Sequence, residues 1–174
     1  MGSSVIADIA RYNNDVVDSL GLRFLELSPN FIGLSREEIM AERDARIEET
    51  NLRSAFFILV SLESDFRIDY EYRCERMIED HLDRPFRLIY QSRRGNTTVG
   101  NRARLKEDIF KTWEVHSSEP IPQLIRDLRD AFDFRNWVAH GRYRMPKPQG
   151  KYDFDDVYSL AENVLKEFKL CRPD

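Results

Sequence analysis

The apolar residues between Ile121 and Ala139 recur every three or four positions, and this spacing constrains the fold more than any other feature of the chain. Such spacing predicts a helix with one face packed against other elements. The recurring residues are Ile121, Leu124, Ile125, Leu128, Ala131, Phe132, Val138 and Ala139. Arg135 falls in the same register, so its guanidinium is expected in the core or at its edge. Because an unpaired buried charge costs on the order of several kcal/mol, Arg135 requires a carboxylate partner or a water-filled cleft.

Helical spacing extends over most of the chain and predicts an all-α fold. A first helix covers Val5 to Leu20, and a final helix covers Val157 to Phe168. Between them, Ser35 and Glu38 have the spacing of a capping box that opens a long central helix. We expect this helix to break or bend near Thr50 and Asn51 and to end near Leu82, before Pro85.

The stretch from Phe86 to Tyr90 is the one segment that fits a short strand or an irregular connection. Turn residues from Gly95 to Gly100 predict a loop, and helix resumes from Arg104 to Val115. The expected architecture is therefore an up-and-down bundle of about five to six helices.

A partner for Arg135 is available on the central helix. Glu63 lies between Leu59 and Phe66 on the apolar face of that helix, so two opposite charges occupy core-facing positions on two helices. A buried ion pair with a purely structural role is one interpretation. A functional site is the other, because charges held in apolar surroundings cluster at such sites.

The opposite face of the helix that carries Arg135 is polar. Arg129, Asp133, Asn136 and His140 follow steps of four, three and four residues, so they share one side. Arg135 and His140 are five residues apart, roughly 140° around the axis, and face each other poorly within one straight helix. Their side chains can converge at the helix end, where Gly141 resembles a C-cap, or they can act together with the same pair of a second subunit.

Basic residues are concentrated in two segments of a chain whose net charge is −4. Seven occur between Arg84 and Lys106, including Arg93 and Arg94, with no acidic residue among them. The segment from Arg142 to Lys151 adds four more, and Tyr143 lies between Arg142 and Arg144. Beside one cleft, the two segments would attract phosphates and offer aromatic surfaces for stacking bases. The alternative is that the first segment is solvated and pairs with the acid-rich region from Glu42 to Glu49.

The string Arg135-Asn136-x-x-Ala139-His140 resembles the Arg-x4–6-His motif of the HEPN superfamily, in which a polar residue, often asparagine, follows the arginine. The resemblance covers six of 174 positions. HEPN domains are small and all-helical, and many are metal-independent endoribonucleases with an active cleft at a two-fold interface. The resemblance therefore implies a single HEPN-like helical domain over residues 1–174, a homodimer, RNA as substrate, no cofactor and no metal.

The chemistry of RNA cleavage without metal suits the residues of this motif. Histidine transfers protons near neutral pH, so His140 is the candidate base or acid, and Arg135 is the candidate phosphate ligand. Asn136 would orient His140 or a phosphate oxygen, while Glu63 would hold Arg135 in place. Arg142, Tyr143, Arg144, Arg93 and Arg94 are the candidate RNA-binding residues. The resemblance further implies a role in toxin–antitoxin systems or antiviral defence, with a cognate antitoxin protein as a candidate partner.

Composition narrows the remaining choices. The longest apolar run, Ala55 to Val60, is far shorter than the ~20 residues of a membrane span, so no membrane association is expected. Two cysteines in helical patterns favour free thiols and a reducing cytoplasmic environment. The sequence has no Gly-rich phosphate loop and no Ser/His/Asp order, which argues against kinases, dehydrogenases and serine hydrolases. Two alternatives stay open: a HEPN-like domain that binds RNA or protein without cleaving, and a helical dimerisation module with a structural Arg135–Glu63 pair.

Overall fold

The computed structural model describes residues 2–25, 31–76, 78–94, 103–140 and 152–172. Every regular element in these ranges is helical, which confirms the all-α prediction. The elements are α1 (Gly2–Arg23), α2 (Arg36–Glu75), α3 (Asp83–Arg94), the π-helical segment η2 (Leu105–Phe110), α4 (Lys111–His116), α5 (Ile121–Ala139) and α6 (Phe154–Glu167).

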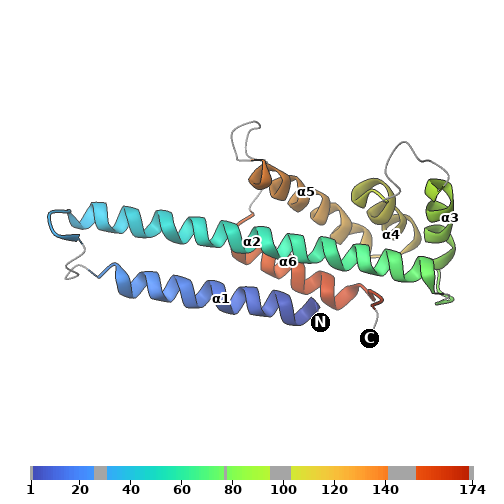
Figure 1. Ribbon diagram of the computed structural model, residues 1–174, viewed down its shortest axis with the longest axis horizontal. Coiled ribbons are helices and arrows are strands. Elements are labelled where there is room, and N and C mark those ends of the chain that lie inside the picture. The colour runs from blue at the N-terminus through green and yellow to red at the C-terminus, as the bar shows by residue number, and fades with distance from the viewer. Residues whose placement is uncertain (1, 26–30, 77, 95–102, 141–151, 173–174) are drawn as a thin grey trace.

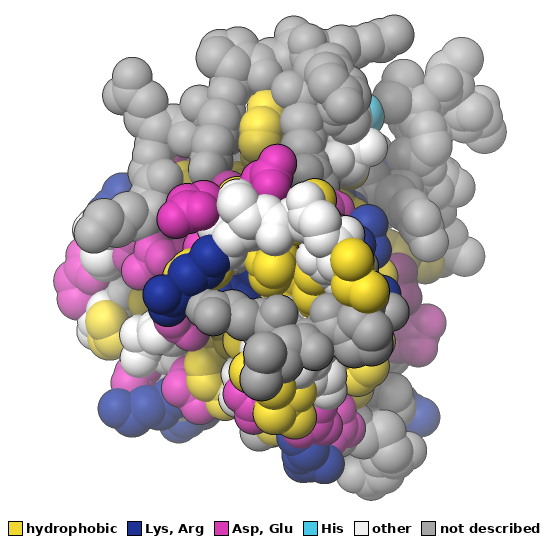
Figure 2. All heavy atoms as spheres, turned by 90° about the vertical axis from the view of Figure 1, so that its left-hand side faces the viewer, with side chains coloured by type: hydrophobic (Ala, Val, Ile, Leu, Met, Phe, Trp, Pro, Cys, Tyr) yellow, Lys and Arg dark blue, Asp and Glu magenta, His cyan; other side chains and the backbone are white. Residues whose placement is uncertain are grey.

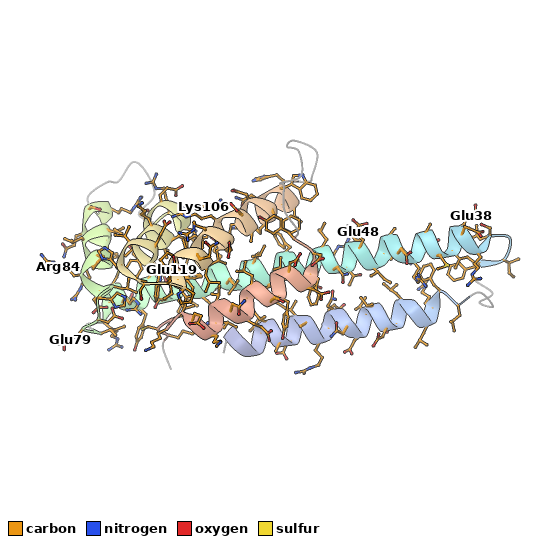
Figure 3. All side chains as sticks on the ribbon, turned by 180° about the vertical axis from the view of Figure 1, so that it is seen from behind. Glu38, Glu48, Glu79, Arg84, Lys106 and Glu119 are labelled. Atoms are coloured by element: carbon orange, nitrogen blue, oxygen red, sulfur yellow. The ribbon has the colours of Figure 1, made fainter. Side chains whose placement is uncertain are left out.

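The long helix α2 organises the molecule. It has 40 residues, which corresponds to about 60 Å. Figures 1 and 3 show α1 running antiparallel along one side of α2, with α5 on the other side. Helix α6 packs on both α1 and α2, and α3 and η2 pack on the C-terminal half of α2. The N-terminal half of α2 and the C-terminal half of α1 extend as a hairpin beyond α5 and α6.

Helix α2 begins at the predicted capping box and continues without interruption through the position where a break or bend was predicted. The Ser35 hydroxyl accepts a hydrogen bond from the Glu38 N–H (3.2 Å), and Glu38 Oε2 accepts one from the Ser35 N–H (2.7 Å). No break occurs near Thr50 and Asn51, since the helix is continuous from Arg36 to Glu75. Asn51 contacts α1 instead: its side-chain oxygen accepts a hydrogen bond from Asn13 Nδ2 (3.0 Å). Packing against α1 therefore stabilises the helix through the polar stretch at residues 42–50, where apolar spacing alone predicts an interruption.

The region after α2 also differs from expectation. Helix α2 ends at Glu75 rather than near Leu82, and residues Phe86 to Tyr90 belong to α3 instead of a strand. Asp83 Oδ2 accepts hydrogen bonds from the N–H groups of Ile78 (2.7 Å) and Glu79 (2.8 Å), which stabilise the turn between the helices. Pro85 falls in the first turn of α3, where an N–H has no helical acceptor to lose.

Among the described residues, the buried side chains form two separate groups. The main group joins α1, α2 and α3 to the later helices, and Phe66 contributes edge-to-face contacts with Phe110 (5.0 Å between centroids) and Phe168 (5.2 Å). A small group of Phe24, Phe31 and Ile39 lies at the extended end of the hairpin. Figure 2 looks onto that end and shows hydrophobic side chains exposed among charged ones. None of the helices in the described ranges is long and apolar enough to cross a membrane.

Candidate functional site

Helix α5 places the motif residues at its C-terminal end. Its buried residues include Leu128, Ala131, Phe132 and Phe134, which fix the helix against the rest of the bundle. His140 is the C-cap, and its N–H donates to the carbonyl oxygen of Asn136 (3.0 Å). The C-cap predicted at Gly141 lies outside the described residues.

Arg135 lies against α2, in contact with Glu63. The Arg135 Nη2 atom donates a hydrogen bond to Glu63 Oε2. The two side chains are only 20% and 19% exposed, so solvent screens the pair weakly. The Arg135 guanidinium carbon also lies 5.0 Å from the ring centroid of Phe132, in cation–π range. The expected contact between a core-edge arginine and a carboxylate on the central helix is therefore present.

A second arginine shares this carboxylate. Arg67 Nε and Nη2 lie 2.8 Å and 2.7 Å from Glu63 Oε1, and Arg67 Nη1 donates to the Ala103 carbonyl oxygen (3.1 Å). The sequence interpretation did not single out Arg67, although its four-residue spacing from Glu63 is the signal that could have found it. Two guanidiniums around one carboxylate give the cluster of Glu63, Arg67 and Arg135 a net charge of +1.

The Arg135 side chain is incompletely satisfied by its protein partners. Its Nε atom is buried and has no hydrogen-bond acceptor among the described residues. Leaving a buried donor without an acceptor costs about 1–3 kcal/mol. The location of this guanidinium is therefore maintained by the contact with Glu63 and by packing on Phe132, at a cost in hydrogen bonding.

Helical geometry puts His140 on a different side of the helix end from Arg135. His140 is exposed and Asn136 is half-buried, while Arg135 contacts α2. The five-residue separation predicts this divergence, because it rotates the two side chains roughly 140° apart. Within one chain, the helix end thus presents a fixed guanidinium on one side and an accessible imidazole on the other.

The polar face of α5 is connected to the preceding helices by ion pairs. Arg129 Nη2 lies 3.3 Å from Glu114 Oε2 on α4. Lys106, labelled in Figure 3, lies on η2 with its Nζ 2.5 Å from Asp133 Oδ1. These two ion pairs hold η2 and α4 against α5.

The first basic segment has acidic partners close to it. Arg93 pairs with Asp108, and Arg87 lies 3.5 Å from Asp83. For the described residues of this segment, the alternative of pairing with residues 42–49 is wrong, because Arg87 and Arg93 pair with Asp83 and Asp108 and Figure 3 shows Arg84 and Glu48 far apart along the molecule. In that acidic region, Glu42 pairs with Arg46 and Glu49 with Arg53, all on α2.

Most of the predicted RNA-binding side chains lie outside the described part of the chain. Arg142, Tyr143 and Arg144 fall in residues 141–151, and the side chain of Arg94 is likewise not described. Among the described candidates, Arg93 is mostly buried against Asp108. The role of all five candidate residues in RNA binding stays a prediction.

The described residues offer neither a metal-binding cluster nor a reactive thiol. The described part of the chain has no group of three His, Cys, Asp or Glu side chains suited to a metal ion. Both cysteines are free thiols. Burial raises the pKa of the Cys74 thiol to about 11, which suppresses its thiolate form and its reactivity.

Comparison of the chain with models of protein families, with curated proteins and with solved structures finds no match. The assignment of a function therefore depends on the residues at the end of α5 and on their resemblance to the HEPN motif.

Proposed function

We propose that the chain is a metal-independent endoribonuclease of HEPN type, active as a homodimer in toxin or phage-defence systems. The observation that carries the proposal is the arrangement at the end of α5. There, a guanidinium held by Glu63 lies within two helical turns of an exposed histidine at the C-cap. This combination supplies a fixed cation for a phosphate and a group that transfers protons.

The cluster around Glu63 suits an RNA phosphodiester. With one carboxylate between two guanidiniums, the net charge of +1 attracts a phosphate without requiring either arginine to move away from Glu63. Arg135 and Arg67 would bind the nonbridging oxygens and stabilise the additional negative charge that develops on them in the transition state.

The reaction then needs two proton transfers. A base removes the proton from the ribose 2′-OH as the 2′-oxygen attacks phosphorus. An acid protonates the 5′-oxygen as its bond to phosphorus breaks. The products are a 2′,3′-cyclic phosphate and a 5′-hydroxyl. His140 of one chain supplies one of these groups and His140 of a second chain supplies the other, while Asn136 orients the imidazole or the phosphate.

The test is cleavage of end-labelled RNA by the purified chain in the presence of EDTA. We expect products with 2′,3′-cyclic phosphate ends, and loss of at least about 100-fold in rate for His140→Ala and Arg135→Ala. His116→Ala is the matched control, because His116 is also an exposed histidine at the end of a helix. Arg135→Lys, which keeps the charge, separates loss of chemistry from loss of folding. Unchanged cleavage in both alanine variants would contradict the proposal.

A non-cleaving HEPN-like domain that binds RNA or a partner protein is the second candidate. The separation of Arg135 and His140 favours it, because Arg135 contacts Glu63 on α2 whereas His140 is exposed roughly 140° further around the axis of α5. RNA retention that weakens steeply with salt, without cleavage, would support this candidate. Neither retention nor cleavage would support a purely structural Arg135–Glu63 pair.

A further inference from the structure

A groove with exposed aromatic side chains runs between α1 and α2. It has a volume of about 620 Å³, and its apolar lining residues are Val5, Ile9, Tyr12, Val16 and Phe57. Tyr12 is 68% exposed and Phe57 is 55% exposed. The four apolar residues of α1 follow helical steps of four, three and four, so they form one continuous stripe along that helix.

This face is distinct from the side on which the hairpin joins the core. Helix α6 packs on α1 and α2, whereas all nine residues that line the groove come from α1 and α2 alone. Val60, one turn beyond Phe57, is also exposed. Contiguous apolar surface of this kind marks an interaction site in soluble proteins, and aromatic residues dominate the binding energy of such sites.

The charges beside the groove are self-complementary. Asp8 lies on α1 and Arg53 lies on α2, so the two walls of the groove carry opposite charges. In a two-fold contact the same surface meets itself, and Asp8 of each copy can approach Arg53 of the other. Their present partners are neighbours on the same helix, Arg11 (3.4 Å) and Glu49 (2.9 Å). Such exposed pairs are worth less than about 1 kcal/mol and exchange readily.

The size of the face suits a dimer. Over the 22 residues of α1, two adjacent helices present a surface about 33 Å long and about 20 Å wide. That footprint of roughly 660 Å² approaches the ~800 Å² that each partner buries in a stable interface.

We infer that the groove between α1 and α2, centred on Tyr12 and Phe57, is the surface at which two copies of this chain associate about a two-fold axis. The location of the dimer surface is independent of the proposed function. Only its effect on the cluster of Glu63, Arg67 and Arg135 rests on the proposed nuclease. Val60 and Arg67 are seven residues apart, so they lie on the same side of α2 and about 10 Å apart along it. If the contact extends past Val60 towards Arg67, the second copy borders the cluster of Glu63, Arg67 and Arg135.

The experiment is sedimentation velocity on the full chain over a range of micromolar concentrations. We expect a dimer for the wild type and a dissociation constant raised at least about 30-fold by Phe57→Glu or Tyr12→Glu. Leu88→Glu on α3 and Val115→Glu on α4 are the controls, because these side chains are 58% and 59% exposed but lie elsewhere. Circular dichroism verifies that each variant keeps its helices.

A charge exchange provides the second arm. Asp8→Arg and Arg53→Asp should each weaken the dimer through like charges, and the double variant should recover it. A monomeric wild type, or a dimer weakened by Val115→Glu but not by Phe57→Glu, would overturn the inference. RNA cleavage is measured in a separate assay from dimer formation. If Phe57→Glu weakens the dimer but the wild type cleaves no RNA, the dimer surface is supported and the proposed nuclease function is rejected. If the wild type cleaves RNA but Phe57→Glu does not change the mass of the particle, the nuclease is supported and the dimer surface is rejected.

Discussion

Glu63 has an unusual position, because a single carboxylate serves two arginines that come from different elements. Its Oε1 atom binds Arg67, one turn further along α2, and its Oε2 atom binds Arg135 on α5. Without a negative charge there, two guanidiniums would face each other at the edge of the core. The repulsion would be felt strongly, because Arg135 is four-fifths buried.

Replacing Glu63 with glutamine tests this account. The amide keeps the shape but offers one acceptor and no charge, so we expect Glu63→Gln to lower the free energy of unfolding by about 1–3 kcal/mol. Urea denaturation followed by circular dichroism measures the change. Glu49→Gln is the matched control: Glu49 also pairs with an arginine four residues later, but at an exposed site where the loss should be about 0.5 kcal/mol or less. Equal losses for the two variants would show that the shared carboxylate has no special role.

At the scale of single residues, the sequence identifies a site residue where a charge interrupts an apolar pattern. Arg135 and Glu63 were both found in that way, and the structure places them in contact. Arg67 was missed, because a glutamate and an arginine four residues apart usually form an ordinary surface pair. Only the packing of α5 and residue 103 against α2 makes that pair part of a partly buried cluster.

At the scale of elements, local chemistry determines where helices begin, and tertiary contacts determine where they continue. The capping box at Ser35 was predictable, because both of its hydrogen bonds join residues three apart. The continuity of α2 past Thr50 was not, since it depends on α1 and on the contact between Asn13 and Asn51. The helical state of residues 86–90 was missed for a different reason: short-range hydrogen bonds from backbone N–H groups to Asp80 and Asp83 form the turn before α3, and apolar spacing does not reveal such bonds.

The capping box supports a prediction about the extended hairpin. Ser35→Ala removes the acceptor for the Glu38 N–H, so we expect a loss of about 1 kcal/mol in the free energy of unfolding. Ser64→Ala is the control, because Ser64 is an exposed serine in the interior of the same helix. There alanine should be neutral or slightly stabilising, given its higher helix propensity. Thermal unfolding of the two variants compares them directly, and a cost at Ser64 that equals the cost at Ser35 would refute the role of the cap.

At the scale of the whole molecule, Arg73 connects three separate parts of the chain. This side chain is 1% exposed and lies on α2. Its Nε donates to Asp69 (2.7 Å), its Nη1 contacts Asp80 before α3, and its Nη2 donates to the carbonyl oxygen of Lys169 (3.1 Å) after α6. Burial acts to raise the pKa of the Asp80 carboxyl, but hydrogen bonds from Arg73 and from the Leu82 N–H outweigh it and hold that pKa below its usual value.

The residues after α6 are joined to the same network. The Cys171 N–H donates to Asp69 Oδ1 (2.7 Å), and Arg172 Nη2 lies 2.7 Å from Asp65 Oδ2. Asp65 and Asp69 are both buried on α2. Arg73 thus balances acidic groups that also hold residues 169–172 against the central helix.

Arg73→Met should therefore destabilise the whole molecule. Methionine fills similar volume but leaves buried Asp69 without its cation and leaves Asp83 with Arg87 alone, and breaking a buried pair in this way typically costs about 3–5 kcal/mol. Arg76→Met is the control, since Arg76 is an exposed arginine three residues later on the same helix end. Amide hydrogen exchange distinguishes the two accounts of Arg73. If it connects distant parts, protection should fall together in α2, in residues 78–83 and in residues 168–172. A loss confined to the C-terminal turn of α2 would mean that Arg73 stabilises only its own helix.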